Sequence, residues 1–158
     1  MSSSATPQPI PYGPPITLEL AKQVVAAAEQ EAMANNWPMV IAVVDSSGHL
    51  VILHKLDHAQ LGSIPIAQRK AETAVSFKRP TKAFEEVLAA GGLGLRLLAA
   101  DNLCPLEGGL PLLRNGELIG GIGVSGMQPT QDAQVAAAGA NVVNYNGPSP
   151  RSARPVTA

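Results

Sequence analysis

The sequence has 158 residues, of which 46% are hydrophobic, so it can form one domain with a buried core. Aromatic residues make up 3% of the chain and the net charge is −1. Both values argue against nucleic-acid binding, since bases need aromatic platforms and phosphates need a basic surface. The single cysteine, Cys104, excludes an intrachain disulfide framework. No run approaches the roughly 18 apolar residues of a membrane span, and the chain does not open with a secretory signal pattern, so we expect a cytoplasmic protein that stays out of membranes.

The two ends of the sequence differ in composition from the region between them. Residues 1–16 contain five prolines, and residues 147–158 carry no periodic apolar pattern. No internal repeat or linker interrupts the region between them. We therefore expect a flexible N-terminal segment at 1–16, a single domain at 17–146 and a flexible C-terminal tail at 147–158.

The first half of the domain predicts one helix and one hairpin. Thr17 can cap a helix that runs to about Asn35, with apolar residues at four-residue spacing on one face. Residues 39–44 are apolar and mostly β-branched, which indicates a buried strand. A turn that ends at Gly48 leads into residues 49–56, which we expect to form the returning strand.

The second half predicts two helices, a second hairpin and a last helix, at residues 63–78, 81–90, 108–125 and 130–143. Asn115-Gly116 is the strongest turn signal in the chain, because both positions of a type I′ turn need positive φ angles. The predicted order is helix-hairpin-helix-helix-hairpin-helix. Antiparallel hairpins separated by helices indicate an α+β domain and exclude a parallel doubly wound sheet.

Residues 121–126 match the pattern G-x-G-x-x-G of dinucleotide-binding loops. That mechanism needs the glycines between a strand and a helix, with an acidic residue about 20 residues further on. Here the match overlaps the predicted strand itself, and no acidic residue follows at that distance. We therefore interpret Gly121 and Gly123 as positions where a ligand, including a bound cofactor, or another backbone can approach the strand closely.

Three histidines, His49, His54 and His58, lie within ten residues of one another. His49 and His54 point to opposite faces of the predicted strand, and no cysteine or carboxylate set accompanies them, so a closed zinc site is not indicated. A haem iron needs only one axial histidine, and His58 or His54 can supply it. His58 follows Asp57 in the loop after the strand, and it is also our candidate for a metal ligand.

Lys70 is an unusual charge, since it falls on the apolar, inward-facing stripe of the predicted helix at 63–78. Two interpretations stay open. Its stem can lie on apolar surface while the ammonium reaches water, or the ammonium can hold an anionic group of a ligand. Arg69, one position earlier, is expected on the exposed face.

Several segments in order along the chain resemble those of the GlcG/HbpS haem-binding family, which is similar to the C-terminal domain of PduO-type proteins. They are residues 43–51, 56–59, 66–74, 108–111 and 119–126, together with Asp132. The resemblance implies a five-stranded antiparallel sheet flanked by helices, assembly into homo-oligomers, and haem binding in several members. The family pattern commonly has a glycine after the loop aspartate, where this chain has His58.

The first functional hypothesis is a haem-binding protein that takes part in haem sensing or degradation. On this hypothesis His58 or His54 is the axial ligand of the iron. Lys70 or Arg69 then lies near a haem propionate, because each carries a positive charge.

The alternative hypothesis is a cofactor-independent isomerase or lyase that acts on a small carboxylated metabolite. His58 or Asp57 would be the acid or base, since a histidine near neutral pKa suits proton transfer, and Lys70 would hold the anion. Whether the protein is an enzyme stays open at this point. Both hypotheses predict a small anionic ligand or haem, and both expect Asp57, His58 and Lys70 to converge on one concave site beside residues 120–126.

Overall fold

The computed structural model describes residues 9–144, so residues 1–8 of the flexible segment expected at 1–16, and the whole tail expected at 147–158, lie outside the described residues. The elements are α1 (Leu18–Ala34), β1 (Val40–Asp45), β2 (Leu50–Lys55), α2 (Ser63–Phe77), α3 (Lys82–Ala89), the 3-10 helix η1 (Gly92–Ala99), β3 (Gly109–Arg114), β4 (Glu117–Ser125) and α4 (Pro129–Ala140). Their order agrees with the predicted α+β class. None of the helices within the described range has the length and apolar character that crossing a membrane demands.

The sheet of the described residues is antiparallel and has the strand order β2-β1-β4-β3. The five-stranded sheet that we expected is therefore wrong, because the two hairpins supply four strands. Residues 11–16 run beside β4 but form only one isolated bridge, between Tyr12 and Leu118. Prolines at positions 11, 14 and 15 cannot donate ladder hydrogen bonds, so this stretch does not become a strand.

Residues 9–16 nevertheless contact the domain. The Tyr12 hydroxyl donates to the carbonyl oxygen of Val75 at 2.8 Å, and the Lys78 ammonium donates to the carbonyl oxygen of Ile10 at 2.6 Å. These contacts hold the end of α2 against the segment that precedes α1.

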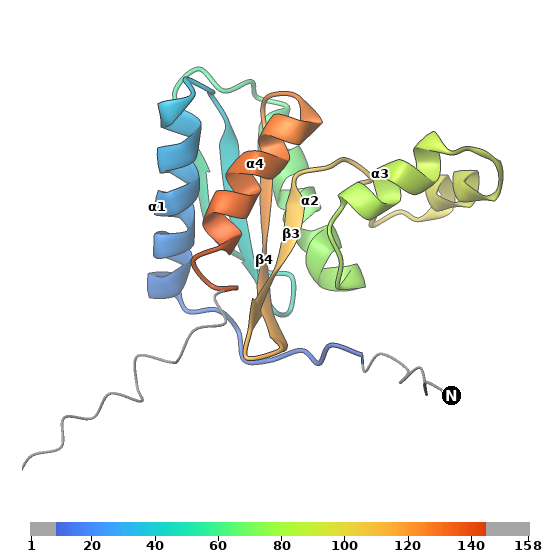
Figure 1. Ribbon diagram of the computed structural model, residues 1–158, viewed down its shortest axis with the longest axis horizontal. Helices are drawn as coiled ribbons and strands as arrows, with labels where there is room; N and C mark the ends of the chain where they lie inside the picture. Colours follow the sequence, from blue (N-terminus) through green and yellow to red (C-terminus); the bar gives the residue numbers. More distant parts are fainter. Residues whose placement is uncertain (1–8, 145–158) are drawn as a thin grey trace, which may run out of the picture.

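The helices form two layers, one on each face of the sheet. Helices α1 and α4 pack against each other over one face, and α2 crosses the other face (Figure 1). With both faces covered, β1 buries five apolar residues in succession, which explains why its sequence does not alternate with polar residues. The Thr17 side chain caps α1, as predicted, and accepts a hydrogen bond from the Leu20 N–H at 3.2 Å.

Helix α2 approaches β4 so closely that there is no room for a side chain at Gly121 or Gly123. A Cβ atom on Gly121 would lie 2.7 Å from the carbonyl oxygen of Ala71, and one on Gly123 would overlap the carbonyl oxygen of Ala67. The glycines that resemble a dinucleotide motif therefore admit the backbone of a helix, which is one of the two approaches that the sequence predicted.

Helices α3 and η1 project from the sandwich as an arm (Figure 1). The arm is anchored at Thr81, whose N–H donates to the carbonyl oxygen of Gly109 and whose Oγ1 accepts from the Gly109 N–H at 2.8 Å. The sequence did not predict η1, because three glycines between positions 91 and 94 indicated a break in the chain. Leu93 and Leu98 on η1 are 85% and 72% exposed, so the arm carries apolar side chains into solvent.

Candidate functional site

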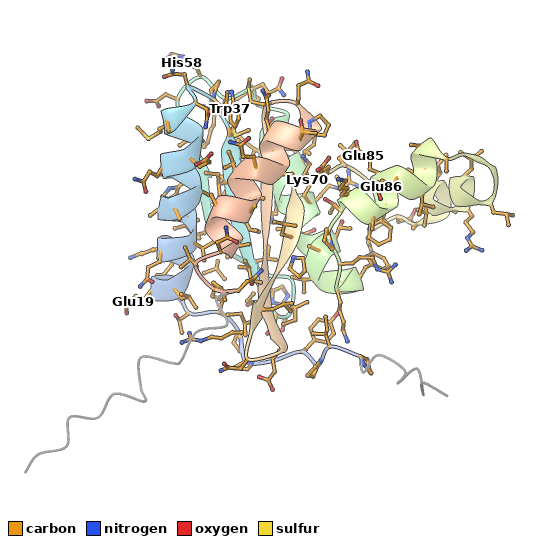
Figure 2. All side chains as sticks on the ribbon, viewed as in Figure 1. Glu19, Trp37, His58, Lys70, Glu85 and Glu86 are labelled. Carbon is orange, nitrogen blue, oxygen red and sulfur yellow. The ribbon has the colours of Figure 1, made fainter. Side chains whose placement is uncertain are left out.

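The residues that we expected in one site lie in two places. His58 is at the end of the sandwich where α1 terminates, whereas Lys70 lies in the middle of the molecule (Figure 2). Lys70 lies seven positions after Ser63, the first residue of α2. At about 1.5 Å per residue the helix carries Lys70 roughly 10 Å from the loop, over the centre of the sheet.

Asp57 and His58 line a surface cavity of about 400 Å³. Its walls come from the last turn of α1, the turn into β1 and the loop after β2. The lining residues are Met33, Asn36, Trp37, Pro38, Leu56, Asp57 and His58. Most of this wall is apolar, and Trp37 and Leu56 also pack against the main hydrophobic core, so the wall has a rigid base.

The two backbones that border this cavity are held by hydrogen bonds. The N–H of Trp37 donates to the carbonyl oxygen of Ala32 at 2.9 Å, which fixes the turn after α1. The N–H of Leu56 donates to the carbonyl oxygen of Met39 at 2.9 Å, which ties the loop to the start of β1. The shape of the cavity is therefore determined by the chain itself and does not depend on a ligand.

His58 has a φ angle of +70°, in the left-handed region that favours glycine. The resemblance led us to expect a glycine at this position, and glycine adopts this region more readily than histidine does. The imidazole is exposed, and none of the hydrogen bonds or ion pairs among residues 9–144 involves it or the Asp57 carboxylate. Both groups are free to contact a ligand.

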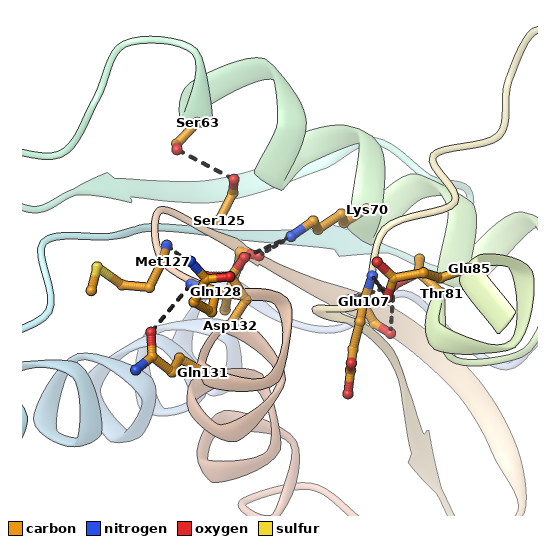
Figure 3. A network of polar contacts seen from close by, with 12 residues as sticks. Ser63, Lys70, Thr81, Glu85, Glu107, Ser125, Met127, Gln128, Gln131 and Asp132 are labelled. Atoms are coloured by element: carbon orange, nitrogen blue, oxygen red, sulfur yellow. Dashed lines mark hydrogen bonds and ion pairs between the residues drawn. The ribbon is translucent and has the colours of Figure 1, made fainter. Parts of the chain in front are cut away.

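Lys70 is in the opposite situation. Its side chain is only 3% exposed, so the ammonium does not reach water. The ammonium donates to the carbonyl oxygen of Val124 at 2.8 Å and to Oδ2 of Asp132 at 3.0 Å (Figure 3). Oδ1 of Asp132 accepts from the Met127 N–H at 3.0 Å. The ion pair thus joins α2, the end of β4 and α4, and its hydrogen-bonding capacity is used within the chain.

The electrostatics of this buried region are dominated by the loss of water. Burial raises the pKa of the Asp132 carboxyl, and the Lys70 ammonium and the Met127 N–H offset part of that rise. Burial also raises the pKa of the Cys104 thiol, against the opposing charges of Lys70 and Arg69. A thiol with a raised pKa is a poor nucleophile, so Cys104 is a packing residue.

Other polar groups nearby are also paired (Figure 3). The Ser125 hydroxyl donates to the Ser63 hydroxyl at 3.3 Å, across the gap between β4 and α2. Ser63 is the first residue of α2, and its side chain makes this tertiary contact. The Glu85 carboxylate accepts from the Glu107 N–H at 3.1 Å at the base of the arm.

The remaining residues from the sequence analysis lie outside the His58 cavity. His54 contacts Glu29 of α1 through Nδ1, on the outer side of the edge strand β2. Arg69 is exposed and lines a separate, polar hollow of about 260 Å³. Gly121 and Gly123 are covered by α2. Within the described part of the chain no three His, Cys, Asp or Glu side chains gather as a metal-binding group.

The structure adds five residues to the candidate site that the sequence analysis did not single out, and Met33 and Trp37 are the two largest contributions in chemical terms. Trp37 is the single tryptophan of a chain that is poor in aromatics, and it precedes a proline that ends the helix region. A single tryptophan directly before this proline was the signal from which Trp37 could have been predicted as a site residue. Met33 had none, because an exposed methionine at the end of a helix is ordinary in sequence terms.

Comparison with known families matches residues 16–141 to a family described as "Haem degrading protein HbpS-like". The chain belongs to the HbpS-like family. Protein GlcG of Escherichia coli K12 is 41% identical to this HbpS-like chain over 110 residues, which cover 70% of the chain and 81% of GlcG.

Two solved structures share the fold of this HbpS-like protein. A double mutant of HbpS from Streptomyces reticuli superposes with a TM-score of 0.77 at 30% identity, over 92% of this chain and 99% of HbpS. The structure named "PduOC:Heme Complex" superposes with a TM-score of 0.74 at 30% identity, over 82% of this chain and 96% of the other. The second of these was solved with haem.

Proposed function

We propose that this protein binds haem in the cavity beside His58. The observation that carries the proposal is an open cavity with apolar walls and one unpartnered imidazole. Trp37, Pro38 and Leu56 offer the flat and aliphatic surfaces that suit a porphyrin, and the His58 imidazole suits its iron. Bound haem would supply an iron centre that can change oxidation state or coordinate a further ligand.

The comparisons support the same proposal. The family is described as haem-degrading, and a structure at 30% identity holds haem. Haem sensing and haem degradation share a first step, in which the apoprotein captures the cofactor. We propose that step as the function of the cavity.

The isomerase or lyase hypothesis receives less support from the geometry. It requires a cation beside His58 and Asp57 to hold a carboxylate, and the residues that line the described cavity include no lysine or arginine. Lys70 neutralises Asp132 instead. Haem needs fewer polar partners from this cavity, because most of the cavity wall is apolar and suits a porphyrin.

The test is a titration of the purified protein with haemin, followed by absorption spectroscopy. We expect a Soret band shifted from that of free haemin, which saturates at a fixed stoichiometry. His58→Asn should lose that band, and asparagine is chosen because it tolerates a left-handed backbone. His49→Asn is the matched control, since His49 is exposed in the β1–β2 turn away from the cavity. An unchanged titration with His58→Asn would refute the proposal.

We also propose that the protein forms homo-oligomers, as the resemblance implies. The arm exposes a set of apolar side chains for which the sandwich offers no cover, namely Val87, Leu93, Leu95 and Leu98. Patches of this kind commonly mark interaction surfaces. Light scattering should give a mass that is a multiple of 16.3 kDa, and Leu93→Gln with Leu98→Gln should lower it. A wild-type mass of a single chain would contradict this.

A further inference from the structure

Met33 and His58 line the same cavity but belong to different elements. Met33 is in the last turn of α1, and His58 is in the loop that follows β2. The cavity therefore carries, on two of its walls, the two side-chain types that most often bind haem iron as axial ligands in electron-transfer haem proteins, an imidazole and a thioether.

The Met33 side chain has no structural task in the described fold. It is 67% exposed, and it does not belong to the residues that pack against the hydrophobic core, whereas Trp37 and Leu56 of the same cavity do. An unbranched side chain with three rotatable bonds and a polarizable sulfur can adjust its position to a ligand. The Met33 side chain is therefore free to contact a ligand, as the His58 side chain is.

The backbones beneath both side chains are anchored. The carbonyl oxygen of Met33 accepts a hydrogen bond from the Asn36 N–H at 3.1 Å, within the turn that ends α1. On the other wall the N–H of Ala59 donates to the carbonyl oxygen of Leu56 at 3.1 Å, and Ala59 itself is buried. A free side chain on a fixed backbone is the arrangement that a ligand site needs.

From this arrangement we infer that Met33 is the second axial ligand of haem iron in this protein, with His58 as the first. The inference rests on the proposed function, because it needs haem in the cavity. It predicts a six-coordinate, low-spin haem. It also predicts a reduction potential above that of the same haem held by histidine alone, because a thioether ligand favours the reduced iron.

The experiment compares Met33→Leu with the wild type after reconstitution with haemin. Leucine keeps the size of the side chain but has no sulfur to bind iron. We expect the wild type to show a low-spin spectrum with the weak far-red band of thioether-ligated ferric haem. Met33→Leu should retain haem but lose that band, shift to a high-spin spectrum and titrate at a lower midpoint potential. Circular dichroism of the apoprotein should be unchanged, since Met33 is exposed.

Met127→Leu is the matched control, because Met127 is also partly exposed but lies between β4 and α4, outside the cavity. It should leave the spectrum as in the wild type. If Met33→Leu and the wild type give the same spectrum and potential, the inference is wrong while haem binding stands. If the wild type takes up no haem, or if His58→Asn binds it unchanged, the proposed function fails and this inference fails with it.

Discussion

The surroundings of Lys70 and of His58 show two opposite uses of a titratable side chain in one small domain. Lys70 is enclosed by α2, β4 and α4, and its ammonium has a carboxylate and a carbonyl as partners. His58 stands on the rim of an open cavity, where no group of residues 9–144 pairs with its ring. The first arrangement stabilises the fold, and the second leaves a group free for a ligand.

The difference follows from what covers each residue. Glycines on β4 let α2 lie directly on the sheet, so any polar group on that side of the helix must find its partner inside the protein. At the end of the sandwich Asp57 and His58 are both exposed, so they can stay without partners from the chain. In this domain the buried ammonium of Lys70 therefore holds elements together, and the exposed imidazole of His58 is left free for a ligand.

The largest expected effect comes from Lys70→Met. The change keeps the length of the side chain but leaves the Asp132 carboxylate and the Val124 carbonyl without their donor. Breaking a buried ion pair by removing one partner costs about 3–5 kcal/mol. Urea denaturation should show a loss of that size in the free energy of unfolding.

Lys82→Met is the control for this prediction. Lys82 lies on the exposed surface of α3, 3.9 Å from Glu86, and surface pairs contribute about 0–1 kcal/mol. If the two variants are equally stable, the Lys70 ion pair does not stabilise the fold, and the contrast with His58 is lost.

The next effect concerns the closeness of α2 and β4. Gly123→Ala places a methyl group against the backbone of α2 at Ala67, where it cannot be accommodated unless the helix moves. Overpacking of this kind costs about 1–3 kcal/mol, and more where backbone must shift. Gly62→Ala is the matched control, because a Cβ there would meet no atom within 4 Å. Equal melting temperatures for the two variants would show that α2 and β4 are less closely packed than the structure indicates.

The smallest effect is a pH dependence that comes from Asp132. Because burial raises its pKa in the folded state above the ordinary value of 3.8, the folded protein holds this proton more tightly than the unfolded chain does. Its contribution to stability is therefore fully present below 3.8 and is lost as the pH rises through the raised pKa. The difference in unfolding free energy between the wild type and Asp132→Asn isolates this contribution from other carboxyls. A difference that grows with pH would mean that the Lys70 charge lowers the pKa of Asp132 by more than burial raises it.

Local signals in the sequence predicted the elements well. The hydroxyl of Thr17 caps α1, and Asn115 and Gly116 form the turn of the second hairpin with φ angles of +53° and +77°. These signals succeed because they depend on residues within a few positions of one another. The fifth strand came from the resemblance and not from such a signal. Within the described residues the stretch before α1 makes only one isolated bridge with β4, since its prolines lack the N–H groups that a continuous ladder needs.

The candidate site could be predicted only in part. Asp57 and His58 were placed correctly in the loop after β2, since that depends on local chain direction. Lys70 was expected beside them because the connection between β2 and α2 is short. Its actual partner, Asp132, is 62 residues away in sequence and comes from the other side of the sheet. No periodicity in one sequence reveals a pairing of that kind, and no signal in the sequence pointed to Met33.

The left-handed backbone of His58 means that this position is a compromise between the stability of the fold and the capacity to contact a ligand. A non-glycine residue in that conformation costs roughly 1–2 kcal/mol, which glycine would avoid. His58→Gly would therefore be expected to raise the stability of the fold while it removes the imidazole from the cavity. A designer who wants this fold as an inert scaffold would begin with His58→Gly, and one who wants a haem protein would leave the strained residue in place.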